Sequence, residues 1–292
     1  MRVRVLKGFT RFRSWGPCEA GAVVDLPDAD AEALIRNGLA EPLEAGAGEA
    51  GRPERRAISY EALARLTEHH LAEIYGAYGV GKSRLAHHIA VEAQGAGKRV
   101  LYVDTEGGLL EEHAKMLKNY WYVGDSVEAL EDAVAWAREH RNDFDLLVVD
   151  SVGHPVYVNY VEMETMDQKL KAYQRLAAVF RDMVRFARGE RGVDFQRIGE
   201  PSRRRALALA VNHPVSEFAK MSKDLPPEEP LAPFGGQIHR VPKAILRAEP
   251  VEMRKDRTVG SLLSYKLRGL PRDLEVARYV ITKEGVSVEW RI

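Results

Sequence analysis

The chain has 292 residues, 45% of them hydrophobic, with 43 basic and 43 acidic side chains, so it can bury a core and has no net charge to attract nucleic acid. Its single cysteine, Cys18, excludes an intrachain disulfide and a cysteine-based metal cluster. No apolar run approaches the ~18 residues of a membrane span, which favours a soluble cytoplasmic protein without a membrane partner.

The N-terminal residues MRVRVLKGF alternate charged with apolar side chains, whereas a signal peptide carries a continuous apolar stretch. Residues 1–43 predict a small β-β-α module. Its strands lie at Val3–Val5 and at AVVDL, and its helix is capped by Asp28 and ends before Gly38. This pattern resembles small N-terminal modules of phage and prophage proteins and favours a modest interaction or packing appendage.

Residues 44–56, EAGAGEAGRPERR, contain no large apolar side chain. Such a segment cannot pack into a core and predicts a flexible linker. The rest of the chain, residues 57–292, alternates strand and helix patterns, which indicates βα units around a largely parallel sheet.

The first strand of this region, LAEIYG, leads into a loop that fits G-x-x-x-x-G-K-[ST] at every fixed position, and an amphipathic helix follows. The glycines let backbone N–H groups and the helix N-terminus converge on phosphate oxygens, so the motif predicts a phosphate-binding loop (P-loop, Walker A). We expect Lys82 to reach the β- and γ-phosphates and Ser83 to ligate Mg²⁺. The predicted nucleotide-binding residues are Gly76, Ala77, Tyr78, Gly79, Val80, Gly81, Lys82, Ser83 and Arg84.

Two acids follow apolar strands farther along the chain. Asp150 ends the strand LLVVD, at the edge where open α/β sheets place ligands. This position predicts a Walker B aspartate that contributes to the Mg²⁺ coordination shell. The strand RVLYVD delivers Glu106 just beyond the same predicted edge, where a carboxylate can polarise an attacking water. A turn-initiating role for Asp150 and a loop-capping role for Glu106 are the alternatives.

Six segments resemble the RecA/RadA recombinase core in order and approximate spacing, in the archaeal RadA and RadB style. They are EIYGAYGVGKS, LYVDTEGG, LLVVDS, LAVNHPV, PFGGQIHRVPKAILRAE and LPRDLEVARYVITKEGV, and the resemblance extends from about residue 57 to the C-terminus. It implies a RecA-like α/β fold, ATP and Mg²⁺ as cofactors, and Glu106 and Lys82 as catalytic groups. It also implies that the end of the VNHPV strand senses the γ-phosphate. Relatives usually carry Asn-Gln where this chain has Asn212-His213, and the imidazole of His213 can also donate a hydrogen bond.

The resemblance implies two DNA-contacting loops, at about residues 152–165 and 216–233. Tyr157 and Tyr160 in the first could stack on bases or pack inside the protein. Residues 171–223 hold 12 basic and 5 acidic side chains, which indicates contact with nucleic acid or simply a solvated face. The candidate DNA-binding residues are Arg203, Arg204, Arg205, Lys220 and Lys223.

Between these loops, apolar residues recur at three- and four-residue spacing and predict a long helix with one stripe against the sheet. The stripe comprises Met163, Met166, Leu170, Tyr173, Ala177, Phe180 and Val184.

In this family ATP usually lies between subunits, so a homo-oligomer or filament is expected. Lys243 and Arg247 share one face of a predicted strand and are candidates for charges supplied in trans to a neighbour. A surface or snorkelling pair is the alternative.

Together these patterns predict a Mg-dependent, DNA-dependent ATPase that acts in recombination or repair and binds single-stranded DNA. A RadB-like regulatory ATPase without strand exchange and a nucleotide-gated scaffold with little turnover are the alternatives.

Overall fold

The computed structural model describes residues 58–160, 163–189, 206–214 and 241–291, with short stretches near the N-terminus at 2–5, 23–25, 31–32, 34–35 and 39–42. The chain divides into two compact units, Met1–Arg56 and Ala57–Ile292. The smaller unit contains a sheet of order β2-β1-β3, formed by β1 (Arg2–Val5), β2 (Val23–Asp25) and β3 (Ala40–Pro42). The sequence pattern had not predicted β3, because three residues ending in proline are too short to show a strand alternation.

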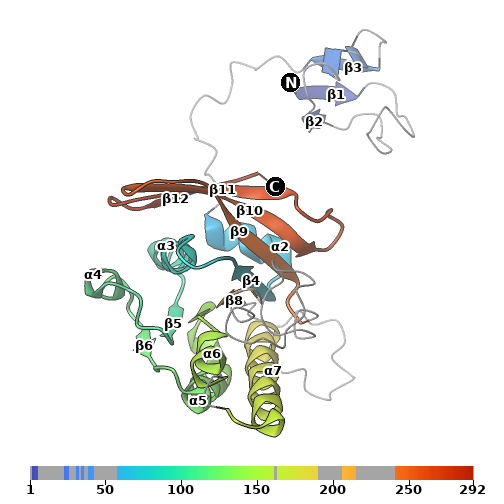
Figure 1. Ribbon diagram of the computed structural model, residues 1–292. Helices are drawn as coiled ribbons and strands as arrows, with labels where there is room; N and C mark the ends of the chain where they lie inside the picture. The colour runs from blue at the N-terminus through green and yellow to red at the C-terminus, as the bar shows by residue number, and fades with distance from the viewer. Residues whose placement is uncertain are drawn as a thin grey trace, which may run out of the picture. The chain divides into compact units, whose positions relative to one another are not determined.

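The larger unit is built on a nine-stranded sheet of order β12-β11-β10-β9-β4-β8-β7-β5-β6 (Figure 1). The six strands from β9 to β6 in this order are parallel, and the remaining pairings, β9–β10–β11–β12, are antiparallel. The strands are β4 (Leu71–Tyr75), β5 (Val100–Asp104), β6 (Tyr120–Tyr122), β7 (Leu146–Asp150), β8 (Leu207–Asn212), β9 (Ala244–Met253), β10 (Arg257–Leu267), β11 (Glu275–Thr282) and β12 (Val286–Trp290).

Helices cover both faces of this sheet (Figure 1). One core lies between the sheet and α2 and α3, and the other between the sheet and α5, α6 and α7. The predicted α/β fold with a mostly parallel sheet is confirmed. None of the described helices is long and apolar enough to cross a membrane. The helices are α2 (Ser59–Thr67), α3 (Lys82–Gly95), α4 (Glu111–Ala114), α5 (Val127–Glu139), the 3₁₀ turn η1 (Arg141–Asp143), α6 (His154–Tyr160) and α7 (Met166–Arg188).

The central strands β4, β5, β7 and β8 are buried at every residue, because helices cover them on both faces. Because they are buried on both faces, these strands have continuous apolar sequences, which made them predictable from the sequence. Since these strands are parallel, their carboxyl ends meet at one edge of the sheet. The P-loop, Glu106, Asp150 and His213 all follow strands that end there.

Half of the segment expected to be the first DNA loop is helical. Residues His154–Tyr160 form α6, with Pro155 in the first turn, where its missing N–H breaks no helical hydrogen bond. Val156 is buried and Tyr157 packs against the same core, which corrects the prediction of a loop and favours packing for Tyr157. The side chain of Tyr160 lies outside the described residues.

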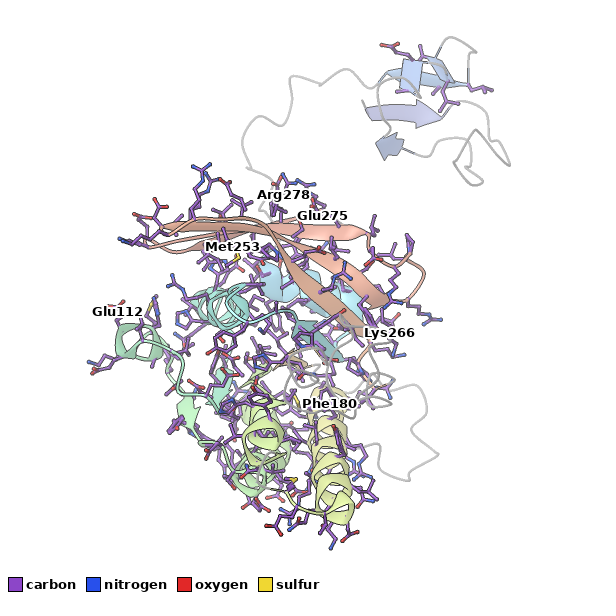
Figure 2. All side chains as sticks on the ribbon, viewed as in Figure 1. Glu112, Phe180, Met253, Lys266, Glu275 and Arg278 are labelled. Carbon is purple, nitrogen blue, oxygen red and sulfur yellow. The ribbon has the colours of Figure 1, made fainter. Side chains whose placement is uncertain are left out.

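The long helix exists, but its buried face is rotated relative to the predicted stripe. Leu170 is 54% exposed and Ala177 is only partly buried. Phe180 is buried as expected, and Figure 2 shows its position on α7. Met183 and Phe186 also face the core. Alternative stripes three or four residues apart fit this sequence nearly equally well, so periodicity alone did not fix the rotation.

Glu73 is a buried acid in the middle of β4. Burial raises the pKa of its carboxyl group to about 7, although a hydrogen bond from Asn212 and the charge of Lys266 both lower it. A raised pKa in the folded state means that stability present below the ordinary value of 4.5 is lost as the pH rises through about 7. Relative to Glu73→Gln, the wild-type free energy of unfolding should therefore fall by on the order of 3 kcal/mol across this range and then level off. Urea denaturation at pH 5, 6, 7 and 8 measures this difference. Parallel pH profiles for the two proteins would contradict it.

Candidate active site

The P-loop joins the end of β4 to the start of α3 with the backbone that an anion site requires. Gly79 and Gly81 have φ of 79° and 92°, in the left-handed region that favours glycine. In the described structure no side chain caps the N-terminus of α3. The N–H groups of the first helical turn are therefore available to phosphate oxygens.

Lys82 and Ser83 lie where the sequence predicted them. Lys82 is buried, and its Nζ donates to the Ala77 carbonyl at 2.9 Å, so the ammonium group is held over its own loop. Ser83 Oγ donates to Asp150 Oδ1 at 3.1 Å. Arg84 instead points to the C-terminal strands and donates to the Thr282 carbonyl at 3.3 Å.

The C-terminal strand β11 supports the P-loop directly. The buried Tyr279 Oη donates to the Val80 carbonyl at 3.1 Å. The side chain of Ile281 lies against Gly81, and a Cβ at Gly81 would overlap its Cδ1. The loop is therefore held between α3 and a strand about two hundred residues later in the chain.

Gly81→Ala should weaken phosphate-ligand binding at least ~10-fold, because an L-residue in the left-handed region costs about 1–2 kcal/mol before the contact with Ile281 is counted. Titration with a fluorescent nucleotide measures the affinity, and circular dichroism checks the fold. Gly95→Ala, at the other end of α3 with open space around its Cβ, is the matched control and should bind as the wild type does. Equal affinity for all three proteins would show that the Gly81 backbone does not shape the site.

Asp150 at the end of β7 is held by two hydroxyl groups. Tyr102 Oη donates to its Oδ2 at 2.7 Å, opposite the contact from Ser83. Burial raises the pKa of Asp150 to about 6, and the nearby acids Glu106 and Asp104 also raise it, while the two hydroxyl donors lower it. The serine hydroxyl and this carboxylate are hard oxygen ligands of the kind that Mg²⁺ prefers, so the pair fits the predicted metal site.

Glu106 is presented by a tight turn after β5. Asp104 Oδ1 accepts hydrogen bonds from the backbone N–H groups of Glu106 and Gly107, and its Oδ2 accepts one from Tyr120 Oη. Glu106 Oε1 accepts from Ser151 Oγ at 2.7 Å and lies 2.9 Å from His213 Nε2. An ionised carboxylate only accepts hydrogen bonds, so His213 Nε2 is the donor.

These contacts set the charge of Glu106. Burial raises the pKa of its carboxyl, but hydrogen bonds from His213 and Ser151 outweigh burial and lower the pKa to about 2. The group is therefore ionised at neutral pH. Such a weakly basic carboxylate orients a water molecule by accepting its hydrogen bond more readily than it removes the proton.

His213 connects the end of β8 to the P-loop as well as to Glu106. The ring of Tyr78, which is 77% exposed, stacks on the imidazole with centroids 6.2 Å apart and an interplanar angle of 16°. The structure thus brings together Tyr78, Glu106 and His213 from three separate loops.

The two residues predicted to act in trans lie beside opposite ends of β4: Lys243 directly precedes β9, and Arg247 is the fourth residue of β9. The Lys243 N–H donates to the Leu71 carbonyl at the start of β4, away from the P-loop. Arg247 lies beside the end of β4 and contacts two carboxylates of its own chain, those of Glu249 and Asp273, at 2.9 and 3.1 Å. The structure does not bring the pair to one place.

The residues predicted to contact DNA, Arg203, Arg204, Arg205, Lys220 and Lys223, lie outside the described residues. Sequence reasoning missed Tyr102, Tyr120 and Ser151, which hold the acids in place. A weak signal was present, because Tyr102 shares a strand face with Asp104 and Ser151 directly follows Asp150.

Known proteins match part of the chain. A family model described as an AAA domain matches residues 72–189, from β4 to the end of α7. The DNA repair and recombination protein RadB of Methanobrevibacter smithii is 34% identical over 95 residues, which cover 28% of this chain and 41% of the relative. The DNA repair and recombination protein RadA of Methanoculleus marisnigri is 35% identical over 91 residues, or 28% of each chain. The larger unit is similar to a RecA-like P-loop NTPase core in its fold and in these matches.

The predicted resemblance to the RecA/RadA core is thereby confirmed, and the phage-type resemblance of the N-terminal module stays a prediction. RadA of Methanocorpusculum labreanum matches over a longer segment, at 27% identity over 125 residues. The chain spans less than half the length of each of these relatives. Within the larger unit, the site combines an anion-binding loop, a pair of metal-type oxygen ligands and a fixed ionised carboxylate. This set suits phosphoryl transfer to water.

Proposed function

We propose that this protein binds ATP with Mg²⁺, hydrolyses the ATP, and acts on DNA in recombination or repair. The observation that carries the proposal is the convergence at one sheet edge of the P-loop, the Ser83–Asp150 pair and the Glu106 carboxylate. Phosphate binding, metal ligation and water orientation require groups of these three kinds within reach of one another.

Each group has a role in the proposed reaction. The P-loop N–H groups and Lys82 bind the phosphates, and Ser83 and Asp150 hold Mg²⁺. Glu106 orients the attacking water, and the strand end that carries His213 senses the γ-phosphate. Mg²⁺, when bound, supplies charge neutralisation on the phosphate oxygens.

The test of the nucleotide proposal uses the whole chain. Calorimetry with ATP, with and without Mg²⁺, should show binding that Mg²⁺ strengthens, and phosphate release should stop when EDTA is added. A protein that binds no nucleotide in either condition would refute the proposal.

The DNA part of the proposal is supported by the basic excess in residues 171–223 and by the relatives, which are named DNA repair and recombination proteins. Neutralising Arg203, Arg204 and Arg205 together should weaken binding of single-stranded DNA and reduce its log–log salt slope by up to ~2, at ~0.7 per phosphate contact. An unchanged slope would show that these arginines form a solvent-exposed face that does not contact DNA.

One observation favours a regulatory ATPase without strand exchange as a second candidate. The segment expected to be the first DNA loop contains no lysine or arginine, and half of it forms α6 against the core. Electron microscopy with single-stranded DNA and a non-hydrolysable ATP analogue separates the two. Filaments favour a recombinase, whereas discrete particles with DNA-independent ATPase activity favour the regulator. A homo-oligomer remains part of the first proposal.

A further inference from the structure

A chain of hydrogen bonds runs from the candidate catalytic carboxylate into the centre of the sheet. Glu106 Oε1 accepts from His213 Nε2, and the backbone N–H of His213 donates to Asn212 Oδ1 at 2.9 Å. Asn212 Nδ2 then donates to Glu73 Oε1 at 2.7 Å. Four residues from three parts of the chain are therefore connected, through side chains and the His213 backbone N–H, and Glu73 is the inner end of the series.

Glu73 is the one charged residue in the otherwise hydrophobic strand β4, LAEIY. It is fully buried between Ala72 and Ile74 in the central strand β4, and its second oxygen, Oε2, has no hydrogen-bond partner among the described residues. Burying a carboxyl group costs free energy unless its contacts offset the cost. A leucine or valine at this position would suit the fold better. Packing of the core therefore does not explain why a glutamate occupies this position.

Glu73 determines which way the Asn212 amide points. An amide has two nearly equivalent orientations about its last torsion, and the partners of its N and O atoms decide between them. Glu73 Oε1 accepts from Nδ2, as an oxygen of an ionised carboxylate or the carbonyl oxygen of a neutral carboxyl group does. With Nδ2 fixed, Oδ1 is directed to the His213 N–H and holds the strand end that carries the imidazole.

We propose that Glu73 is a positioning residue that, through Asn212, holds the His213 imidazole against Glu106 and so sets the hydrolysis rate without contributing to nucleotide affinity. The inference rests on the proposed ATPase function. It is separate from phosphate binding, because Glu73 lies within β4, three residues before the P-loop begins at Gly76, and its Oε1 accepts a hydrogen bond from Asn212.

The experiment compares two replacements of Glu73 that fill similar space. Glu73→Met keeps the unbranched shape but removes the acceptor, and it should lower kcat by about 10- to 100-fold, the effect of a misplaced reactive group. Glu73→Gln keeps an acceptor for Asn212 and should restore kcat to within about 3-fold of the wild type. The dissociation constant for a fluorescent nucleotide should stay within about 2-fold for both variants, because neither touches the P-loop.

Tyr75→Phe is the matched control for removing a polar atom from the same strand. The Tyr75 hydroxyl is buried with no hydrogen-bond partner among the described residues, so its loss should leave kcat unchanged. The combined variant Glu73→Met/Asn212→Ala should be no slower than Asn212→Ala alone, since Glu73 acts through Asn212.

A second readout does not depend on ATP turnover. In nucleotide-free protein, ¹⁵N NMR of the imidazoles should show His213 as the Nε2–H form with a hydrogen-bonded proton, assigned by its absence in His213→Gln. Glu73→Met should shift or broaden this signal, and Glu73→Gln should not. This measurement tests the positioning role of Glu73 separately from the proposed ATPase function, because it remains valid if the wild type hydrolyses no ATP.

Several outcomes would overturn the inference. They are an unchanged imidazole signal in Glu73→Met, a Glu73→Gln variant as slow as Glu73→Met, and an equal loss of kcat and nucleotide affinity. If Glu73→Met does not fold, Glu73→Leu replaces it, and an imidazole signal identical to the wild type in that variant also refutes the proposal.

Discussion

Glu106→Gln should bind nucleotide as tightly as the wild type and hydrolyse it at least ~100-fold more slowly, the usual contribution of a positioned acid–base group. The amide has the size of the carboxylate, and its oxygen can still accept from Ser151 and His213, so the local structure should persist. What is lost is the negative charge that orients the attacking water. Phosphate release and fluorescent-nucleotide titration measure the two quantities separately.

The matched control is Glu112→Gln on α4, an exposed residue on the outside of the molecule (Figure 2). It makes the same chemical change a few residues from Glu106 and should leave both quantities at wild-type values. Wild-type hydrolysis in Glu106→Gln would remove this residue from the reaction. A large loss of nucleotide affinity would assign it to binding instead.

Lys82→Ala should lose nucleotide affinity by ~10- to 100-fold, since hydrogen bonds to charged groups contribute about 1.5–3 kcal/mol. Hydrolysis should become undetectable, because the ammonium group also neutralises charge on the phosphoryl group in transfer. In the structure its Nζ is held by the Ala77 carbonyl, so the charge lies within the loop before any ligand arrives.

Lys115→Ala provides the comparison for this variant, because Lys115 is an exposed lysine on α4 paired with Glu111. Its affinity and rate should match the wild type. If Lys82→Ala retained both affinity and turnover, the P-loop would not be the nucleotide site.

The sequence predicted the parts of the site that depend on local patterns. The glycine spacing of the P-loop needs particular backbone angles, and Gly79 and Gly81 adopt them. Asp150 and Glu106 were predicted from apolar strands that end in acids, because parallel strands bring their carboxyl ends together. Fully buried strands have continuous apolar runs that are readable without knowledge of their neighbours.

The contacts that orient these residues could not be read in the same way. The bond from Tyr279 to Val80 joins residues 199 positions apart, and the bond from Asn212 to Glu73 joins residues 139 apart. Such pairs depend on strand order and side-chain rotamers, which hydrophobic periodicity does not encode. The prediction of which face of α7 is buried was wrong for a related reason. Leu170 fits an apolar stripe by its spacing but faces solvent.

The contact between β11 and the P-loop also constrains when the site can form during synthesis. The P-loop is made early, while its support from Tyr279 lies 199 residues beyond Val80. At roughly 5–20 residues per second, a ribosome needs on the order of 10–40 s to make the intervening chain. During this interval β4 and α3 can fold locally, but the loop lacks the strand that closes over it. A nascent chain therefore emerges with its nucleotide motif complete in sequence and unfinished in shape, and the motif gains its support only when β11 has been translated.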